Sequence, residues 1–235
     1  MRVLTLLSGG LDSTTLLYKA IDSVGHNNVW TVSFNYGQRH KFELTRASEL
    51  AFMNHVQNDI VDLTSLGQLF KGSALSDPEV TVPHGHYAKE SMVATIVPNR
   101  NSIMLNCAVG IAISYGADEV WAAMHAGDHA IYPDCRPEFV EKLNELVGLA
   151  NAWENPVPKV VAPFIGIPKD AIITIGVKLN VPWEFTWSCY EGNPPIHCGR
   201  CGTCVERQEA FHLAGVPDPT HYADSEFWKN EVGLA

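Results

Sequence analysis

Short apolar runs alternate with amphipathic segments along most of the chain. The runs that predict buried strands cover residues 3–7, 28–34, 56–63, 119–124 and 160–163. Between them, apolar residues recur at the three- and four-residue spacing of helices with a buried face, which predicts helices over 13–23, 40–54, 101–116, 138–150 and 169–179. Strands that alternate with helices are typical of right-handed crossovers and of a parallel sheet covered on both faces. The pattern therefore predicts an α/β fold built on a doubly wound parallel sheet.

Two parts of the chain depart from this alternation. Residues 71–97 show no clear periodicity and contain two glycines and two prolines, so we expect a long loop, and loops of that length are uncommon unless they serve a function such as an active site. From Trp183 onward, the chain is rich in aromatic residues, Gly, Pro and Cys, with one short helix expected near 202–214. We therefore expect an α/β domain over residues 1–182 and a small segment over residues 183–235 that packs on it.

Composition and charge narrow the classes of protein. Apolar residues make up 46% of the chain and charged residues 18%, which is typical of a globular protein with a buried core and excludes disorder. Sixteen Lys and Arg against 26 Asp and Glu give a net charge of −10, which argues against a broad basic face for nucleic acid or an anionic membrane. No apolar run approaches the roughly 18 residues of a membrane span, and the N-terminal run is too short for a signal peptide. We expect a cytoplasmic protein without nucleic-acid or membrane partners, whose cysteines are thiolates rather than disulfides.

The first motif that carries chemistry is Ser8-Gly9-Gly10-Leu11-Asp12-Ser13, between the first strand and the first helix. Its glycines let the backbone turn sharply beside an anion, and the N–H groups that follow lie at a helix N-terminus, where the dipole favours negative charge. An acidic residue here would repel phosphate unless a cation lay between them, so Asp12 suggests Mg²⁺; the alternative is a plain turn in which Asp12 caps the helix. The motif matches neither the Walker nor the Rossmann pattern. The residues expected to bind a nucleotide phosphate are Leu7, Ser8, Gly9, Gly10, Leu11, Asp12, Ser13, Thr14 and Thr15, with Asp12 and Ser13 also expected in catalysis.

Other polar residues follow predicted strands or begin predicted helices. Arg39 follows the second strand, at the edge where doubly wound sheets bind ligands, and is expected to contact the nucleotide, although a solvated loop is the alternative. Arg100 and Asn101 begin the longest helix, where a cation gains nothing from the dipole unless a phosphate or carboxylate is bound. Lys169 begins a later helix and is expected to reach the phosphates; the alternative is a surface lysine. We assign Arg100 and Lys169 to catalysis and Asn101 to substrate binding.

Four cysteines in the C-terminal segment form a second motif. Cys189, Cys198, Cys201 and Cys204 follow the spacing Cys-x8-Cys-x2-Cys-x2-Cys. Four soft ligands suit tetrahedral Zn²⁺ with no open position, and such a site is structural, supplying folding energy to a segment that has little core. An iron–sulfur cluster and a disulfide pair are the alternatives, but the Cys-Pro ending of ferredoxins is absent. We expect one structural zinc ion per chain.

Several motifs carry a resemblance to a known family. The Ser-Gly-Gly-Leu-Asp-Ser loop resembles the pyrophosphate loop of the N-type ATP pyrophosphatases, which cleave ATP between the α and β phosphates. The segments Ser33-Phe34-Asn35-Tyr36-Gly37-Gln38-Arg39-His40, Val97-Pro98-Asn99-Arg100-Asn101, Tyr132-Pro133-Asp134-Cys135-Arg136 and Trp187-Ser188-Cys189-Tyr190 follow in order. Together with the cysteine motif they resemble the 7-cyano-7-deazaguanine synthase (QueC) family over nearly the whole chain.

The resemblance implies an ATP-dependent carbon–nitrogen ligase of queuosine biosynthesis that converts 7-carboxy-7-deazaguanine and ammonia to 7-cyano-7-deazaguanine (preQ0) through two adenylated intermediates. ATP would be a co-substrate, with Mg²⁺ required, and a homodimer is expected. Asp134 would accept N–H donors from the deazapurine, and Arg136 would hold a carboxylate.

Other functions stay open at this point. One is a related enzyme that stops at the amide, and another is a tRNA-modifying pyrophosphatase, against which the charge of −10 argues. A nucleotide-binding module without turnover is a third, although the intact Asp12 and the full set of motifs argue against it.

Overall fold

Five parallel strands form the centre of the computed structural model, which describes residues 1–87, 90–153 and 156–234. The strands are β1 (Val3–Leu6), β2 (Val29–Asn35), β3 (Gln57–Asp62), β4 (Glu119–Trp121) and β5 (Lys159–Val161). They lie in the order β3-β2-β1-β4-β5, and each neighbouring pair is parallel. The α/β fold with a doubly wound parallel sheet is confirmed.

Helices connect the strands where the periodicity predicts them. The helices are α1 (Leu11–Val24), α2 (Phe42–Met53), α3 (Thr64–Gly67), α4 (Arg100–Tyr115), α5 (Pro137–Ala150), α6 (Lys169–Lys178), α7 (Gly202–Leu213) and α8 (Phe227–Val232). The sequence does not predict α3 and α8, because one or two turns are too short to show a helical period. Among the described residues, no helix is long and apolar enough to cross a membrane.

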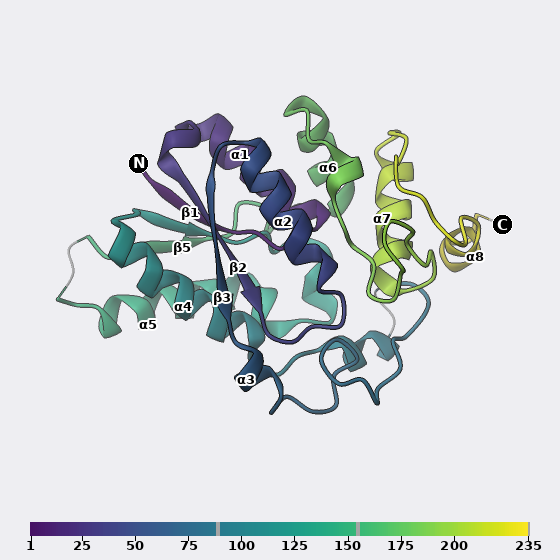
Figure 1. Cartoon of the computed structure of the whole chain (residues 1–235), viewed down its shortest axis with the longest axis horizontal. Coiled ribbons are helices and arrows are strands. Elements are labelled where there is room, and N and C mark those ends of the chain that lie inside the picture. The colour runs from purple at the N-terminus through teal and green to yellow at the C-terminus, as the bar shows by residue number, and fades with distance from the viewer. Residues whose placement is uncertain (88–89, 154–155, 235) are drawn as a thin grey trace.

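The sheet separates two apolar layers (Figure 1). Side chains alternate between the faces along a strand, so Val3 packs with Leu16 of α1 on one face, while Leu4 packs with Leu105 of α4 on the other. Helices α1, α2 and α6 contribute to the first layer, and α4 and α5 to the second. Because both faces are covered, the strands β1 and β2 are buried along most of their length.

The direction in which the chain adds strands reverses beside β1. From β1 the chain goes to β2 and β3 on one side, and then returns to place β4 on the other side of β1. Open α/β sheets bind ligands outside the carboxyl ends of the strands at such a switch point. The topology therefore predicts a ligand-binding site among the residues that follow β1 and β4.

The C-terminal segment packs against the α1 side of the domain. Trp183 and Phe211 are buried in the same apolar cluster as α1 and α6, and the Trp187 backbone N–H donates to the Gly9 carbonyl at 2.9 Å. The expected loop over 71–97 consists mostly of turns, with a 3₁₀ helix at Glu90–Thr95, and its residues 88–89 lie outside the described residues. Both regions approach the carboxyl edge of the sheet.

Candidate active site

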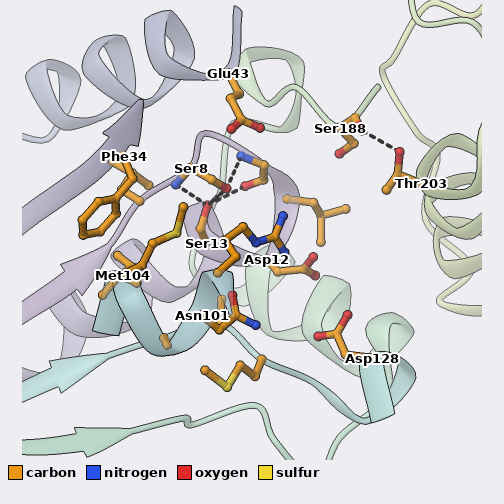
Figure 2. A pocket seen from close by; sticks show the side chains of 18 of the residues that line it. Ser8, Asp12, Ser13, Phe34, Glu43, Asn101, Met104, Asp128, Ser188 and Thr203 are labelled. Carbon is orange, nitrogen blue, oxygen red and sulfur yellow. Dashed lines mark hydrogen bonds between the residues drawn. The ribbon is translucent and has the colours of Figure 1, made fainter. Parts of the chain in front are cut away.

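A cavity of about 280 Å³ opens at this switch point, beyond the carboxyl ends of β1 and β4. Its walls come from the loop after β1, the residues after β4, the start of α4, Tyr87 of the 71–97 segment and the C-terminal segment (Figure 2). The predicted residues that line it are Leu7, Ser8, Gly10, Leu11, Asp12, Ser13, Arg100, Asn101 and Lys169. Segments distant in sequence therefore meet at one concave site.

The loop after β1 is held in a shape suited to an anion. The Ser8 N–H donates to the Ser13 Oγ at 3.1 Å, and the two serine hydroxyls lie 2.9 Å apart. Gly9 has a φ of 84°, and a Cβ there would collide with the Glu43 carbonyl of α2, so only glycine fits. Gly10 caps α1 without any side-chain hydrogen bond to the cap, which leaves first-turn N–H groups unsatisfied. Asp12 is therefore not a capping residue.

Asp12 is instead part of a buried group of charges. Its Oδ2 lies 3.1 Å from the Lys169 Nζ, which also contacts the Glu206 Oε2 at 2.5 Å. Burial lowers the pKa of Lys169, but Asp12 and Glu206 outweigh it, so the pKa is raised and the ammonium stays charged. The other oxygen, Asp12 Oδ1, is buried and has no hydrogen-bond partner within the described residues. An unpaired carboxylate oxygen beside an anion-binding loop fits a hard cation such as Mg²⁺.

Two further groups complete this cluster and were missed as site residues by sequence reasoning. His125 follows β4, and its Nε2 lies 3.7 Å from Asp128 Oδ2, 3.9 Å from Asp12 Oδ2 and 4.0 Å from Glu206 Oε1. Its Nδ1 accepts from the Gly127 N–H, so the ring proton of neutral His125 is on Nε2, facing the acids. Glu206 comes from α7, on which several polar residues are buried, and burial raises its pKa. No local motif marks either residue.

Part of the cavity wall is aromatic. Phe34, Tyr36, Tyr132, Trp187 and Tyr190 line it. Flat apolar faces of this kind stack on heterocycles.

Asn101 lies at the same wall and donates its Nδ2–H to the Cys135 Sγ at 3.2 Å. Burial raises the pKa of Cys135, so this residue is a neutral thiol rather than a thiolate nucleophile.

Several predicted residues lie away from the cavity. Arg39 is exposed and donates to the carbonyls of Asp77 and Val80 at 3.0 and 2.9 Å, which holds the 71–97 segment. Arg136 is exposed and donates to the His129 carbonyl at 2.9 Å; Asp134 does not line the cavity either.

Gly9, Thr14 and Thr15 support the loop from behind. Thr14 and Thr15 donate their hydroxyls to the carbonyls of Gly10 and Leu11 at 2.7 and 2.9 Å. These contacts give the three residues a structural part in the loop, and contact with a ligand stays a prediction for each of them.

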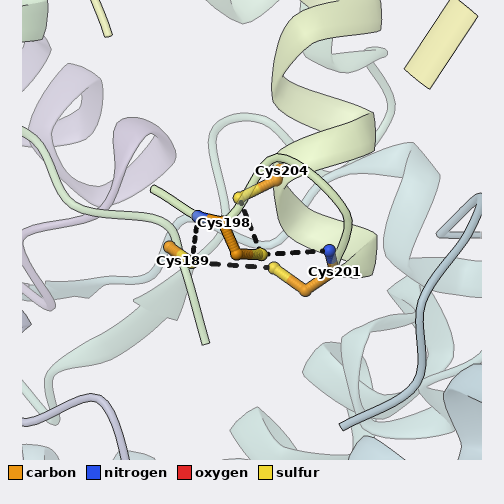
Figure 3. Close-up of side chains that lie close together, drawn as sticks. All are labelled: Cys189, Cys198, Cys201 and Cys204. Carbon is orange, nitrogen blue, oxygen red and sulfur yellow. Dashed lines mark hydrogen bonds between the residues drawn. The ribbon is translucent and has the colours of Figure 1, made fainter. Parts of the chain in front are cut away.

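The four predicted cysteines come together at the start of α7 (Figure 3). Their sulfur atoms lie within 4.8 Å of one another, with Cys198 to Cys204 at 3.9 Å and Cys189 to Cys201 at 4.0 Å. Bonds of about 2.3 Å to one tetrahedral ion place sulfur atoms about 3.8 Å apart. Backbone N–H groups of Gly192 and Cys198 donate to the Cys189 sulfur at 2.9 and 3.2 Å. The donor set fits a single metal ion held by four thiolates.

The parallel sheet, the anion-binding loop at its switch point and the aromatic-walled cavity define an α/β enzyme that acts on a nucleotide and a second flat substrate. The sequence profile of the family described as Queuosine biosynthesis protein QueC matches residues 2–215. The chain belongs to this family.

Curated relatives agree over almost their whole length. The chain is 51% identical over 232 residues to the 7-cyano-7-deazaguanine synthase of Rhizobium johnstonii, covering 99% of this chain and 96% of that one. It is 50% identical over 232 residues to the 7-cyano-7-deazaguanine synthase of Ruegeria pomeroyi, covering 99% of each chain. A 7-cyano-7-deazaguanine synthase from Brucella ovis is 49% identical over 97% of both.

Proposed function

We propose that this chain is an ATP-dependent ligase that converts 7-carboxy-7-deazaguanine and ammonia to 7-cyano-7-deazaguanine. The observation that carries this proposal is the joining of two surfaces in one cavity: an anion-binding loop, and an aromatic wall for a heterocycle. Full-length relatives with this activity in their names support the same reaction. Reacting groups held side by side gain the rate advantage of an intramolecular reaction.

The first half of the reaction activates the carboxylate. A carboxylate oxygen attacks the α-phosphorus of ATP, the bond from that phosphorus to the bridging oxygen breaks, and pyrophosphate leaves with the electron pair. The N–H groups at the start of α1, the hydroxyls of Ser8 and Ser13 and the ammonium of Lys169 face the departing charge. Ammonia then displaces AMP and leaves an amide. In the second half, the amide oxygen is adenylated in the same way, and loss of both N–H protons and of AMP, which leaves with the former amide oxygen, gives the nitrile.

Mg²⁺ would supply charge neutralisation at the phosphates, and Asp12 is the residue we assign to hold it. The buried, unpaired Asp12 Oδ1 supports this assignment. Lys169 fixes the other carboxylate oxygen, which orients Asp12 before any ligand enters. No side chain is required as a covalent nucleophile, and the neutral thiol of Cys135 agrees with that.

Zinc is the metal we propose for the four cysteines. In a four-iron cluster each thiolate binds a different iron atom, which sets the sulfur atoms farther apart than one shared ion does, whereas these four lie within 4.8 Å. All four positions are filled by protein, so the ion would be structural. We also propose a cytoplasmic homodimer; six cysteines outside disulfides are in keeping with a reducing compartment.

The decisive experiment is mass spectrometry of the products formed from ATP, ammonium and 7-carboxy-7-deazaguanine. We expect the amide to appear first, then the nitrile, with two AMP and two pyrophosphate released per nitrile. An amide that accumulates without conversion would restrict the enzyme to the first half. No AMP in the presence of the acid would refute the proposal.

A further inference from the structure

Arg100 is a cation on the cavity wall whose neighbours are aromatic rather than acidic. Its Nη1 donates to the Tyr36 hydroxyl at 3.4 Å, and its guanidinium lies 5.9 Å from the centre of that ring. Within the described part of the chain it makes no salt bridge, whereas Lys169 across the cavity has two. Arg100 is half-buried, and a guanidinium partly withdrawn from bulk water without a negative partner is unfavourable unless a ligand supplies one.

The tyrosines beside Arg100 do not supply that charge. Burial raises the pKa of Tyr36, Tyr132 and Tyr190 above the ordinary phenol value, so these hydroxyls are neutral at physiological pH. They offer dipoles and ring faces only. These tyrosines therefore do not neutralise the positive charge of Arg100.

The acids that line the cavity have partners of their own. Glu43 accepts from the Gln38 amide at 3.0 Å and pairs with His40 at 3.1 Å. Asp128 accepts from the His125 backbone N–H at 3.1 Å and from the Tyr87 hydroxyl at 3.4 Å. Asp12 pairs with Lys169. Asp12 and Asp128 thus belong to the charges around Lys169, and Glu43 is held by Gln38 and His40, which leaves Arg100 for an incoming anion.

The backbone around Arg100 adds to the positive character of this wall. Arg100 is the first residue of the 16-residue α4, whose first turn contains no acid. The residue before it, Asn99, adopts a left-handed conformation with a φ of 56° and makes no side-chain cap. A helix N-terminus without a side-chain cap and a guanidinium at the same place both favour a bound anion.

We propose that Arg100 binds the carboxylate of the heteroaromatic acid while the surrounding rings contact its flat face, which makes Arg100 a specificity-determining residue for the first activation only. This inference rests on the proposed function. A guanidinium that holds one carboxylate oxygen leaves the other free to attack the α-phosphorus. In the second activation the substrate is a neutral amide, so the same side chain has no charge to recognise.

The test compares the two halves of the reaction in Arg100→Gln, Arg100→Lys and wild type. Each is supplied either with the 7-carboxylic acid or with the 7-amide, plus ATP and saturating ammonium, and AMP release is measured. For Arg100→Gln we expect kcat/KM for the acid to fall roughly 10- to 150-fold, the range for losing a hydrogen bond to a charged group. We expect kcat/KM for the amide, and KM for ATP, to change by less than about threefold. Arg100→Lys keeps a positive charge and a hydrogen-bond donor, and should show a smaller loss confined to the acid.

Arg2→Gln is the matched control, because Arg2 is exposed at the opposite end of β1 and should leave both halves unchanged. Equilibrium binding of acid and amide without ATP gives a second readout, in which the acid alone should weaken in Arg100→Gln. Equal losses with acid and amide, together with a raised KM for ATP, would assign Arg100 to a phosphate and overturn the inference. Unchanged use of the acid would overturn it as well. A wild type that turns over neither compound would instead refute the proposed function.

Discussion

Glu206 connects the metal-binding segment to the phosphate site, and its replacement by Gln is expected to damage catalysis far more than folding. The residue lies on α7, two positions after Cys204, and is only 9% exposed. Its Oε2 contacts the Lys169 Nζ at 2.5 Å, so it fixes the side chain that we propose faces the phosphates. Glu206 is thus a positioning residue rather than a catalytic one.

The expected loss of stability is small because Lys169 keeps a second partner. In Glu206→Gln, the Asp12 carboxylate remains 3.1 Å from Lys169, and the amide oxygen can still accept a hydrogen bond. Exchanging a charged acceptor for a neutral one should cost about 1–1.5 kcal/mol, or about 2–6 °C in Tm for a chain of this size. A displacement of Lys169 by about 1 Å from its productive position can lower the rate about 100-fold. We therefore expect kcat to fall by about 10- to 100-fold.

The assay is ATP-dependent AMP release with the 7-carboxylic acid, run beside thermal denaturation. Glu209→Gln is the matched control, since Glu209 lies one turn further along α7, pairs with His86 at 3.1 Å and does not line the cavity. It should keep kcat within about twofold, and Glu206→Asp should recover part of the lost rate. Wild-type kcat in Glu206→Gln, or an equal loss in Glu209→Gln, would refute the positioning role.

Four other outcomes follow from the same structure. Asp12→Asn should lower adenylation by at least about 100-fold while lowering the Tm no more than Glu206→Gln does, because it removes one of the two charges beside Lys169 and no core contact, as Mg²⁺ titration and denaturation would check. Metal analysis should find one zinc per chain, and chelation or Cys201→Ser should lower the Tm and the helicity of the C-terminal segment; iron, or an unchanged Tm, would contradict this. Burial alone would raise the pKa of Asp218, but Arg207 and the Tyr222 hydroxyl lower it below the usual 3.8. The Asp218 carboxylate therefore stabilises the folded chain fully above that pH, and this contribution is lost as the pH falls below it. In Asp218→Asn, the Tm should fall less steeply on acidification than in wild type. Ammonium should support turnover, with a rate that rises with pH as free NH₃ increases, and glutamine should not replace it in a preparation free of glutaminase.

The fold was predictable because its signals are local. The short apolar run of β1 and the helical spacing in α1 can each be read from a few neighbouring residues, and the predicted ranges match the structure to within about three residues at each end. The strand order depends on contacts between remote segments, and no periodicity encodes it. Likewise, α8 has too few residues to show its period.

In the candidate site, too, the local motif was predictable and the contacts between distant segments were not. The loop over 8–13 is one continuous motif, so its position at the cavity follows from sequence. In the 132–136 motif, however, the side chains do not share a direction: Cys135 lines the cavity, whereas Arg136 turns to the surface. His125, which lines the cavity, and Glu206, which contacts Lys169, come from segments far from the loop, and only the folded chain brings them together with Asp12.

The boundary expected near residue 182 rests on a change in composition, yet the cavity takes walls from both sides of it. Trp187 and Ser188 line the cavity, and the Trp187 N–H binds the Gly9 carbonyl of the phosphate loop. Arg207, fully buried on α7, donates to the Thr186 hydroxyl at 2.7 Å just before those residues. Because α7 begins within the cysteine cluster and carries Glu206 to Lys169, we expect metal binding by the cysteines to help fix the position of Lys169 as well. We therefore expect the order of the part of the active-site wall that residues 183–235 supply to depend on that metal.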